Sequence, residues 1–77
     1  MEEKIKAILA AILQIEANEI KNDFGPDSCQ NWDSLGNLRL ITALEQAFQI
    51  KFTWSEISAM THFASIRDII ARKHGGA

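Results

Sequence analysis

Hydrophobic residues in the first part of the chain recur every three or four positions, which is the spacing of one face of an α-helix. They are Ile5, Ile8, Leu9, Ile12 and Leu13. Glu2 and Glu3 lie at the end of the helix dipole that favours negative charge, and Glu2 can pair with Lys6 one turn later. The pattern predicts a first helix over about residues 2–16.

A polar stretch over residues 17–33 interrupts this periodicity. It contains the only proline of the chain, Pro26, and several Asn and Ser residues that favour turns. A loop of this length in so small a chain is usually functional or locally packed. We expect Ile20, Phe24 and Trp32 to attach it to the core.

A second helical pattern covers about residues 34–49. Its main apolar stripe consists of Leu35, Leu38, Ile41, Leu44 and Phe48. The stripe is widened by Leu40, Ala43 and Ala47. Because so much of this helix is apolar, we expect it to be central and to contact more than one neighbour.

Two helix-start signals follow. Thr53 and Glu56 have the spacing of a capping box, which predicts a short helix carrying Ile57 and Met60. Ser65 and Asp68 have a similar arrangement ahead of a last helix. That helix is expected to bury Ile66, Ile69 and Ile70, and to end in the basic run Arg72-Lys73-His74 before Gly75.

The predicted architecture is an all-α four-helix bundle with three longer helices, one short helix, and a long loop between the first two. The alternation over residues 49–52 is too short and isolated to predict a strand. With 77 residues, the chain is expected to form one domain, residues 1–77, with a flexible tail at 75–77.

Composition narrows the classes of protein to which the chain can belong. One Cys and two His cannot supply a disulfide framework or a zinc site, so the fold must rest on its core, and 47% hydrophobic residues make that feasible. No segment approaches the roughly 20 apolar residues that span a bilayer, and the acidic start differs from a signal peptide. A net charge of −2 argues against nucleic acid as a partner. A cytoplasmic monomer without membrane insertion is expected.

The junction between the polar loop and the second helix carries the main candidate for chemistry, the segment Trp32–Gly36. Asp33 and Ser34 are favoured helix caps, so a capping role alone could explain them. The same position offers unpaired N–H groups and partial positive charge, which favour a phosphate ester on a serine. No general base lies nearby in sequence, so Ser34 is interpreted as an attachment point and not as a nucleophile.

This segment resembles the attachment motif of the acyl carrier proteins and of the related peptidyl and aminoacyl carriers, in Asp33-Ser34-Leu35. The resemblance continues through Leu38, Leu40, Ile41, Ala43, Leu44, Glu45 and Phe48, and later through Phe63, Ile66 and Ile69. Chain length and helix order also fit, so the resemblance covers nearly the whole chain.

The resemblance implies a carrier and not an enzyme. Ser34 would receive covalent 4′-phosphopantetheine from coenzyme A through a phosphopantetheinyl transferase, which makes the chain a phosphoprotein. The thiol of the arm would hold an acyl or aminoacyl group as a thioester and present it to the loading and processing enzymes of a fatty acid, polyketide or other specialised pathway. Asp33 would help to dock the transferase, and Leu35 would give partners an apolar contact.

Some positions depart from the family pattern. Family members of fatty acid synthesis usually have an acidic second helix, whereas here Arg39, Gln46 and Ala47 occupy positions that are often acidic, Gly36 replaces a common Asp, and only Glu45 remains. Electrostatic steering by this helix is therefore expected to be weak or differently aimed. This favours a dedicated carrier for a specialised pathway, such as that of a secondary metabolite, a modified lipid or an activated amino acid.

Several residues have two interpretations. Gly36 is either a tolerated imperfection near a helix end or a contact that lets the arm or a partner approach closely, and Arg39 is a further partner contact. Cavity candidates for the cargo are Leu38, Phe48, Trp54, Ile57 and Met60, of which Phe48, Ile57 and Met60 are core residues first. Trp54 could instead cover the edge of the core. Cys29 is either an idle thiol or the partner of the arm in a mixed disulfide, and His62 is expected to be a solvated loop residue without a metal.

The alternative function is a helical protein-docking module without a prosthetic group. It explains the broad apolar helix face and a cap at Ser34, and it predicts a stability loss of about 1 kcal/mol for Ser34→Ala. An enzyme is a third, more distant class, since the sequence contains no paired carboxylates, nucleophile–base set or metal cluster.

Overall fold

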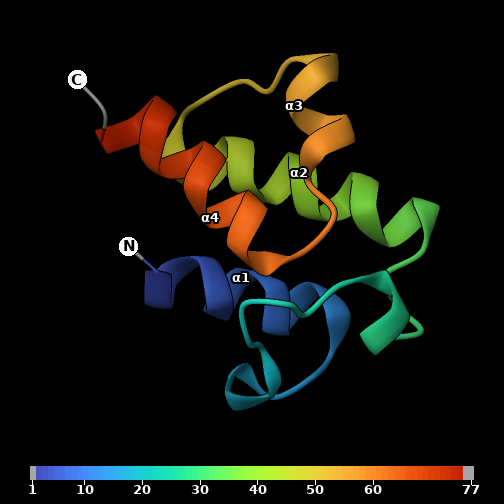
Figure 1. Cartoon of the computed structure of the whole chain (residues 1–77). Coiled ribbons are helices and arrows are strands. Elements are labelled where there is room, and N and C mark those ends of the chain that lie inside the picture. The colour runs from blue at the N-terminus through green and yellow to red at the C-terminus, as the bar shows by residue number, and fades with distance from the viewer. Residues whose placement is uncertain (1, 76–77) are drawn as a thin grey trace.

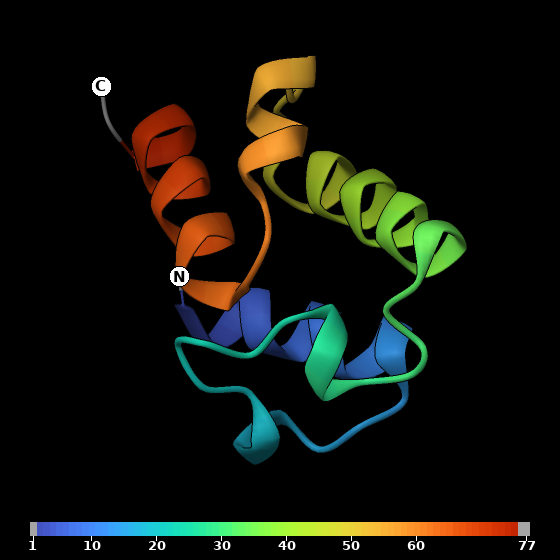
Figure 2. The same ribbon diagram turned by 45° about the vertical axis from the view of Figure 1, so that its right-hand side comes forward.

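A computed structural model describes residues 2–75 of the chain and contains no strand in that range. Its elements in order are α1 (Glu2–Leu13), two short 3-10 turns η1 (Ala17–Glu19) and η2 (Pro26–Ser28), α2 (Ser34–Phe48), α3 (Trp54–Ala59), α4 (Phe63–Ile70) and a π-helical turn η3 (Ala71–Gly75). The predicted all-α bundle of four helices is therefore confirmed. In Figures 1 and 2, α1 lies on the opposite side of α2 and α4 from α3.

The first helix ends earlier than the sequence pattern predicts. It stops at Leu13, because Gln14 adopts a left-handed conformation with φ of 60° and Ile15 N–H donates to the Ala10 carbonyl over 3.1 Å. The second helix ends in the same way at Phe48, because the next residue, Gln49, is left-handed with φ of 55°. Glycine usually occupies such positions, so the glutamines gave no signal for either helix end.

The long loop is attached to the core as expected. Ile20, Phe24 and Trp32 are buried, and the rings of Phe24 and Trp32 stack with centroids 6.0 Å apart. Phe63 N–H donates to the Phe24 carbonyl over 2.8 Å, which joins the loop to the start of α4. Ala64 N–H donates to the loop carbonyl of Asn22 in the same way, over 3.0 Å.

These loop contacts explain a correction at the last helix. It was expected to start near Ser65, but α4 begins at Phe63 with His62 as its N-cap. The Ser65 hydroxyl is instead the third-residue partner of the cap, because it accepts from His62 N–H over 3.2 Å and donates to the His62 carbonyl over 2.7 Å. Of the tail expected at 75–77, Gly75 belongs to η3 and residues 76–77 lie outside the described residues.

The second helix is only partly central. Leu40, Ile41, Leu44 and Phe48 are buried, as the stripe predicts, but the list of exposed large hydrophobic residues includes Leu35 and Leu38. The expectation of a central helix therefore does not hold at these two positions, whereas the exposure of Leu35 agrees with its expected role as an apolar contact for partners. The first turns of α2 extend beyond α3 and α4 in Figures 1 and 2, so these helices leave the outer face of the turns uncovered.

The short helix α3 begins with the predicted capping box. Glu56 N–H donates to the Thr53 hydroxyl over 3.1 Å, and Thr53 N–H donates to Glu56 Oε1 over 2.8 Å. None of its own residues is fully buried, and Trp54 is 81% exposed. The interpretation of Trp54 as a cover for the core edge was therefore wrong, because the indole stands in solvent on the outside of α3.

The antiparallel contact of α1 with α2 forms the base of the bundle. The Lys4 ammonium near the start of α1 donates to the Ala47 carbonyl near the end of α2 over 3.2 Å. At the opposite end, the Asn31 amide donates to the Leu13 carbonyl over 2.8 Å. The expected pair between Glu2 and Lys6 is present at 3.8 Å. Within residues 2–75, no helix has the length and apolar character needed to cross a bilayer.

Candidate functional site

The start of α2 is held by Asp33 and not by Ser34. Asp33 is the N-cap, and its Oδ1 accepts from Gly36 N–H over 2.8 Å. The backbone carbonyl of the same residue accepts from Asn37 N–H over 2.8 Å. The capping role that the alternative function assigned to Ser34 therefore belongs to its neighbour.

Ser34 is the first residue of α2, and it is exposed. Among the described residues, no group forms a hydrogen bond with its hydroxyl. A first helical residue also has a backbone N–H that lacks an intrahelical acceptor, as does the next residue, Leu35. The hydroxyl therefore stands in solvent beside free donors and the positive end of the helix dipole, where an anion is favoured.

Gly36 has a packing role that neither of its two interpretations foresaw. It is buried, and a Cβ atom at this position would lie 2.0 Å from the Asn31 carbonyl oxygen. The absence of a side chain lets the end of the loop close onto the first turn of α2. Burial also corrects the expectation of a partner contact at Gly36, since a partner cannot reach it directly.

The loop end is fixed by two further asparagine contacts that sequence reasoning missed. The Trp32 indole N–H donates to Asn37 Oδ1 over 3.1 Å, and Asn31 joins the loop to the end of α1. Both contacts orient the turn that carries Ser34. The sequence contains no distinct signal for them, because Asn in this segment is also typical of an ordinary turn.

Next to Ser34, α2 exposes apolar and cationic surface. Leu35 is 58% exposed and Leu38 is 60% exposed, and the Arg39 side chain beside them is also exposed. No ion pair joins Arg39 to any of the described residues. The structure thus places Ser34, Leu35, Leu38 and Arg39 on one accessible surface, with Asp33 at its edge.

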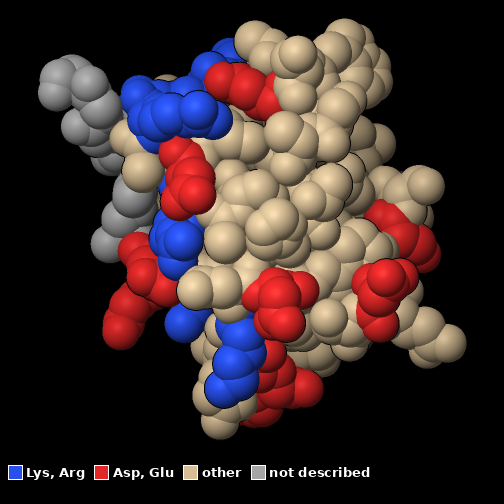
Figure 3. All heavy atoms as spheres, viewed as in Figure 1, with Lys and Arg blue, Asp and Glu red and all other residues tan. Residues whose placement is uncertain are grey.

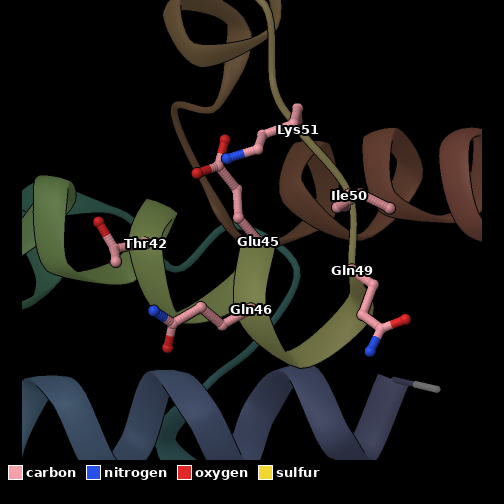
Figure 4. Close-up of a pocket in the computed structure, with 6 residues that line it drawn as sticks. All are labelled: Thr42, Glu45, Gln46, Gln49, Ile50 and Lys51. Atoms are coloured by element: carbon pink, nitrogen blue, oxygen red, sulfur yellow. The ribbon is translucent and has the colours of Figure 1, made fainter.

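Glu45 is the one acidic residue of α2, and its carboxylate has an internal partner. Glu45 Oε2 accepts from Phe52 N–H over 3.0 Å, so it holds the segment between α2 and α3. It also lines a hollow of about 310 Å³ with Thr42, Gln46 and three residues that follow the helix. Figure 4 shows the Lys51 amine pointing toward this carboxylate. The expectation that α2 steers partners only weakly through acidic charge is consistent with this arrangement.

Four of the five cargo-cavity candidates, all except Leu38, lie apart from the exposed surface around Ser34. Phe48 and Met60 are each 5% exposed and belong to the packed core, while Ile57 is half-buried against it. Trp54 stands outside on α3, and Leu38 is on the surface of α2. The structure therefore does not bring the five candidates together around one interior space.

The remaining candidates show no assembled chemistry. Cys29 is a half-buried free thiol, and His62 Nδ1 lies 2.9 Å from the hydroxyl of Thr61. In the described range, no cluster of His, Cys, Asp or Glu residues could hold a metal ion. The Lys73 ammonium pairs with Glu56 at 3.0 Å, and Figure 3 shows basic side chains gathered near the end of α4. Paired and solvated charges of this kind are common at the end of a helix.

Comparison with known proteins bears on this site. No protein-family model matches the chain. An acyl carrier protein of Buchnera aphidicola subsp. Baizongia pistaciae (strain Bp) is 38% identical to it over 72 residues, which cover 94% of this chain and 92% of that protein. Such a likeness along nearly the full length of both chains agrees with the four-helix fold. The chain belongs to the acyl carrier protein family.

Proposed function

We propose that this carrier protein tethers an acyl or aminoacyl intermediate through a 4′-phosphopantetheine arm on Ser34. The observation that carries the proposal is the exposed hydroxyl of Ser34 at the first position of α2, without a hydrogen-bond partner among the described residues. A modifying enzyme can reach it without unfolding the chain. Since Asp33 supplies the cap, modification of Ser34 would not cost the helix its N-terminal hydrogen bond.

The residues around Ser34 suit a phosphodiester. The free N–H groups of Ser34 and Leu35 and the positive end of the helix dipole favour the negative charge of the group. When bound, the arm supplies a terminal thiol that holds the cargo as a thioester. The roles of this chain are to hold the attachment oxygen on a rigid helix start and to present the cargo to partners.

The exposed surface around Ser34 is the proposed partner surface. Leu35 offers an apolar contact, Asp33 lies beside the attachment oxygen, and Arg39 is available to a carboxylate of a partner. The partners are a phosphopantetheinyl transferase and the enzymes that load and process the cargo. Because α2 has little free acidic charge, a dedicated carrier of a specialised pathway fits better than a general fatty acid carrier.

We further propose that residues 1–77 act as one monomeric carrier domain. The core that unites the four helices and the loop supports this assignment. A cytoplasmic location and a mixed disulfide between Cys29 and the arm stay predictions. For the disulfide, an unchanged free-thiol count in the mass spectrum of the oxidised, arm-bearing protein would end the idea.

The direct test is incubation with a promiscuous phosphopantetheinyl transferase and coenzyme A, followed by intact mass spectrometry. The expected result is a mass gain of one phosphopantetheine that is lost in Ser34→Ala and retained in Ser55→Ala. Ser55 is a matched control because it is also exposed in the first turn of a helix, α3. No gain under conditions that modify another carrier would contradict the proposal and favour a docking module without a prosthetic group.

A further inference from the structure

An open groove runs between α1 and α2, beside the turn that carries Ser34. Its apolar lining comes from Ile12 of α1 and from Leu35, Leu38 and Ala43 of α2. From Leu35 to Gln46 it follows α2 over about 16 Å, at 1.5 Å per residue. Because Leu35 and Leu38 are 58% and 60% exposed, a small molecule lying on them would keep much of its own surface in water, whereas a helix of another protein would cover both.

The charge of the groove comes from Arg39. It is the only charged side chain among the described residues that line the groove, and it is exposed. Arg39 also lines a smaller adjoining hollow of about 160 Å³, which contains Asp33. The Asp33 carboxylate accepts the Gly36 N–H, and no ion pair links it to Arg39 within residues 2–75. The guanidinium is therefore available to a carboxylate from outside the chain.

The other charged residue of α2, Glu45, does not offset this positive charge on the groove. Its Oε2 accepts the Phe52 N–H over 3.0 Å, and Figure 4 shows the Lys51 amine pointing toward the carboxylate. Glu45 is not part of the groove lining. A basic partner would therefore meet a like charge at Arg39, whereas an acidic partner would meet a complementary one.

We propose that the groove between α1 and α2 docks an acidic amphipathic helix of an enzyme that acts on the arm of Ser34. Apolar side chains of that helix would cover Leu35 and Leu38, and a carboxylate beside them would pair with Arg39. This inference rests on the proposed function, because it is the arm that brings such an enzyme to the carrier. It gives the partner the opposite charge from the one that an acidic second helix selects.

The test uses the full chain and two stapled helical peptides of about 12 residues, long enough to cover the groove. Both peptides have the same leucine stripe, flanked by two Glu in one peptide and by two Lys in the other. Methyl and amide NMR titrations would measure the dissociation constants and locate the contacts. We expect the Glu peptide to bind about fivefold more tightly than the Lys peptide and to shift the methyl signals of Ile12, Leu35 and Leu38.

Charge reversal provides the matched controls. Arg39→Glu should make the Lys peptide the tighter binder, while Lys21→Glu, the same change at an exposed loop lysine outside the groove lining, should leave the preference for the Glu peptide. Leu38→Gln should weaken the binding of both peptides. The preference of the parent chain should shrink at about 0.5 M salt, because the ions screen an exposed charge pair.

The outcomes separate this inference from the function on which it rests. A chain that gains the mass of the arm at Ser34 but binds both peptides equally, prefers the Lys peptide, or shows shifts outside the groove keeps the carrier function and overturns the docking proposal. Dimers in size-exclusion chromatography that Leu38→Gln abolishes would assign the groove to a second copy and also overturn it. No mass gain at Ser34 would overturn the carrier function, and with it the identity of the partner as an enzyme that acts on the arm.

Discussion

The Asn31 carbonyl oxygen lies so close to Gly36 that a Cβ atom there would be 2.0 Å away from it. The contact brings the end of the long loop against the first turn of α2, and the Asn31 amide also bonds to Leu13 at the end of α1. The position of the candidate attachment residue, Ser34, thus depends on three segments that meet at this point.

Gly36→Ala is expected to destabilise the protein by about 1–3 kcal/mol, because the backbone must move to accept the new methyl group. Alanine would otherwise favour the helix by roughly 1 kcal/mol, so the steric effect should exceed the gain in helix propensity. Urea unfolding would measure the difference, with Gln46→Ala on the exposed side of the same helix as a control. Equal or greater stability of the Gly36 variant would contradict this account of the contact.

Asp33→Ala and Ser34→Ala are expected to differ in stability. The Asp33 carboxylate accepts the Gly36 N–H, so its loss should cost about 1 kcal/mol. The Ser34 hydroxyl makes no hydrogen bond with the described residues, and its removal should change the free energy of unfolding by less than about 0.5 kcal/mol. Urea titrations of both apo variants would check this. A larger loss for Ser34→Ala would return the capping role to Ser34.

The two tryptophans are expected to respond in opposite ways. Trp32 is 3% exposed and its indole bonds to Asn37, so Trp32→Phe should cost about 1–3 kcal/mol through a small cavity and an unpaired acceptor. Trp54 is 81% exposed, so Trp54→Phe should stay within about 0.5 kcal/mol. Thermal unfolding followed by circular dichroism gives both values. Similar losses in the two variants would show that the loop is not held by Trp32.

Glu56 should make the stability of the protein depend on pH. The Thr53 backbone N–H, and next the Lys73 ammonium, lower the pKa of this carboxyl below its ordinary value of 4.5. A lowered pKa in the folded state means that the stabilisation is complete above pH 4.5 and is lost as the pH falls through the folded-state pKa. Glu56→Gln should therefore be less stable than the parent chain at neutral pH.

The measurement is the urea midpoint of parent and variant at neutral pH and at about pH 3. The difference between them should shrink in acid, as protonation removes the interaction from the parent chain as well. Glu3→Gln is the control, since the described residues offer Glu3 no ion pair. A difference that stays constant across the two pH values would contradict the assignment to Glu56.

Local signals in the sequence were sufficient for most helix positions. The three-four spacing of Ile5, Leu9 and Leu13 identified α1, and Thr53 with Glu56 identified the start of α3. These signals work because a helix face and a capping box involve only residues within a turn or two of each other. The end of α1 was not predicted correctly, because Gln14 takes a left-handed conformation that residue type alone does not favour.

The burial of α2 could not be obtained from the pattern. Leu35 and Leu44 look alike in a sequence stripe, yet Leu44 is 0% exposed and Leu35 is 58% exposed. The difference depends on where α3 and α4 cross the helix. Likewise, the sequence gives no sign that the Glu45 carboxylate has an internal partner. In the structure it accepts a hydrogen bond from Phe52 N–H, in the segment after α2.

The amino-acid sequence by itself determined the helical class of this protein, the anchors of its loop, and the serine at the start of its second helix, since each follows from the chemistry of neighbouring residues. Only the tertiary structure decided that Asp33 and not Ser34 caps that helix, that Gly36 is required by Asn31, and that a groove opens beside the leucines. The physical reason is that these features depend on backbone geometry and on distances between segments that are remote in the chain, and side-chain periodicity contains no information about either.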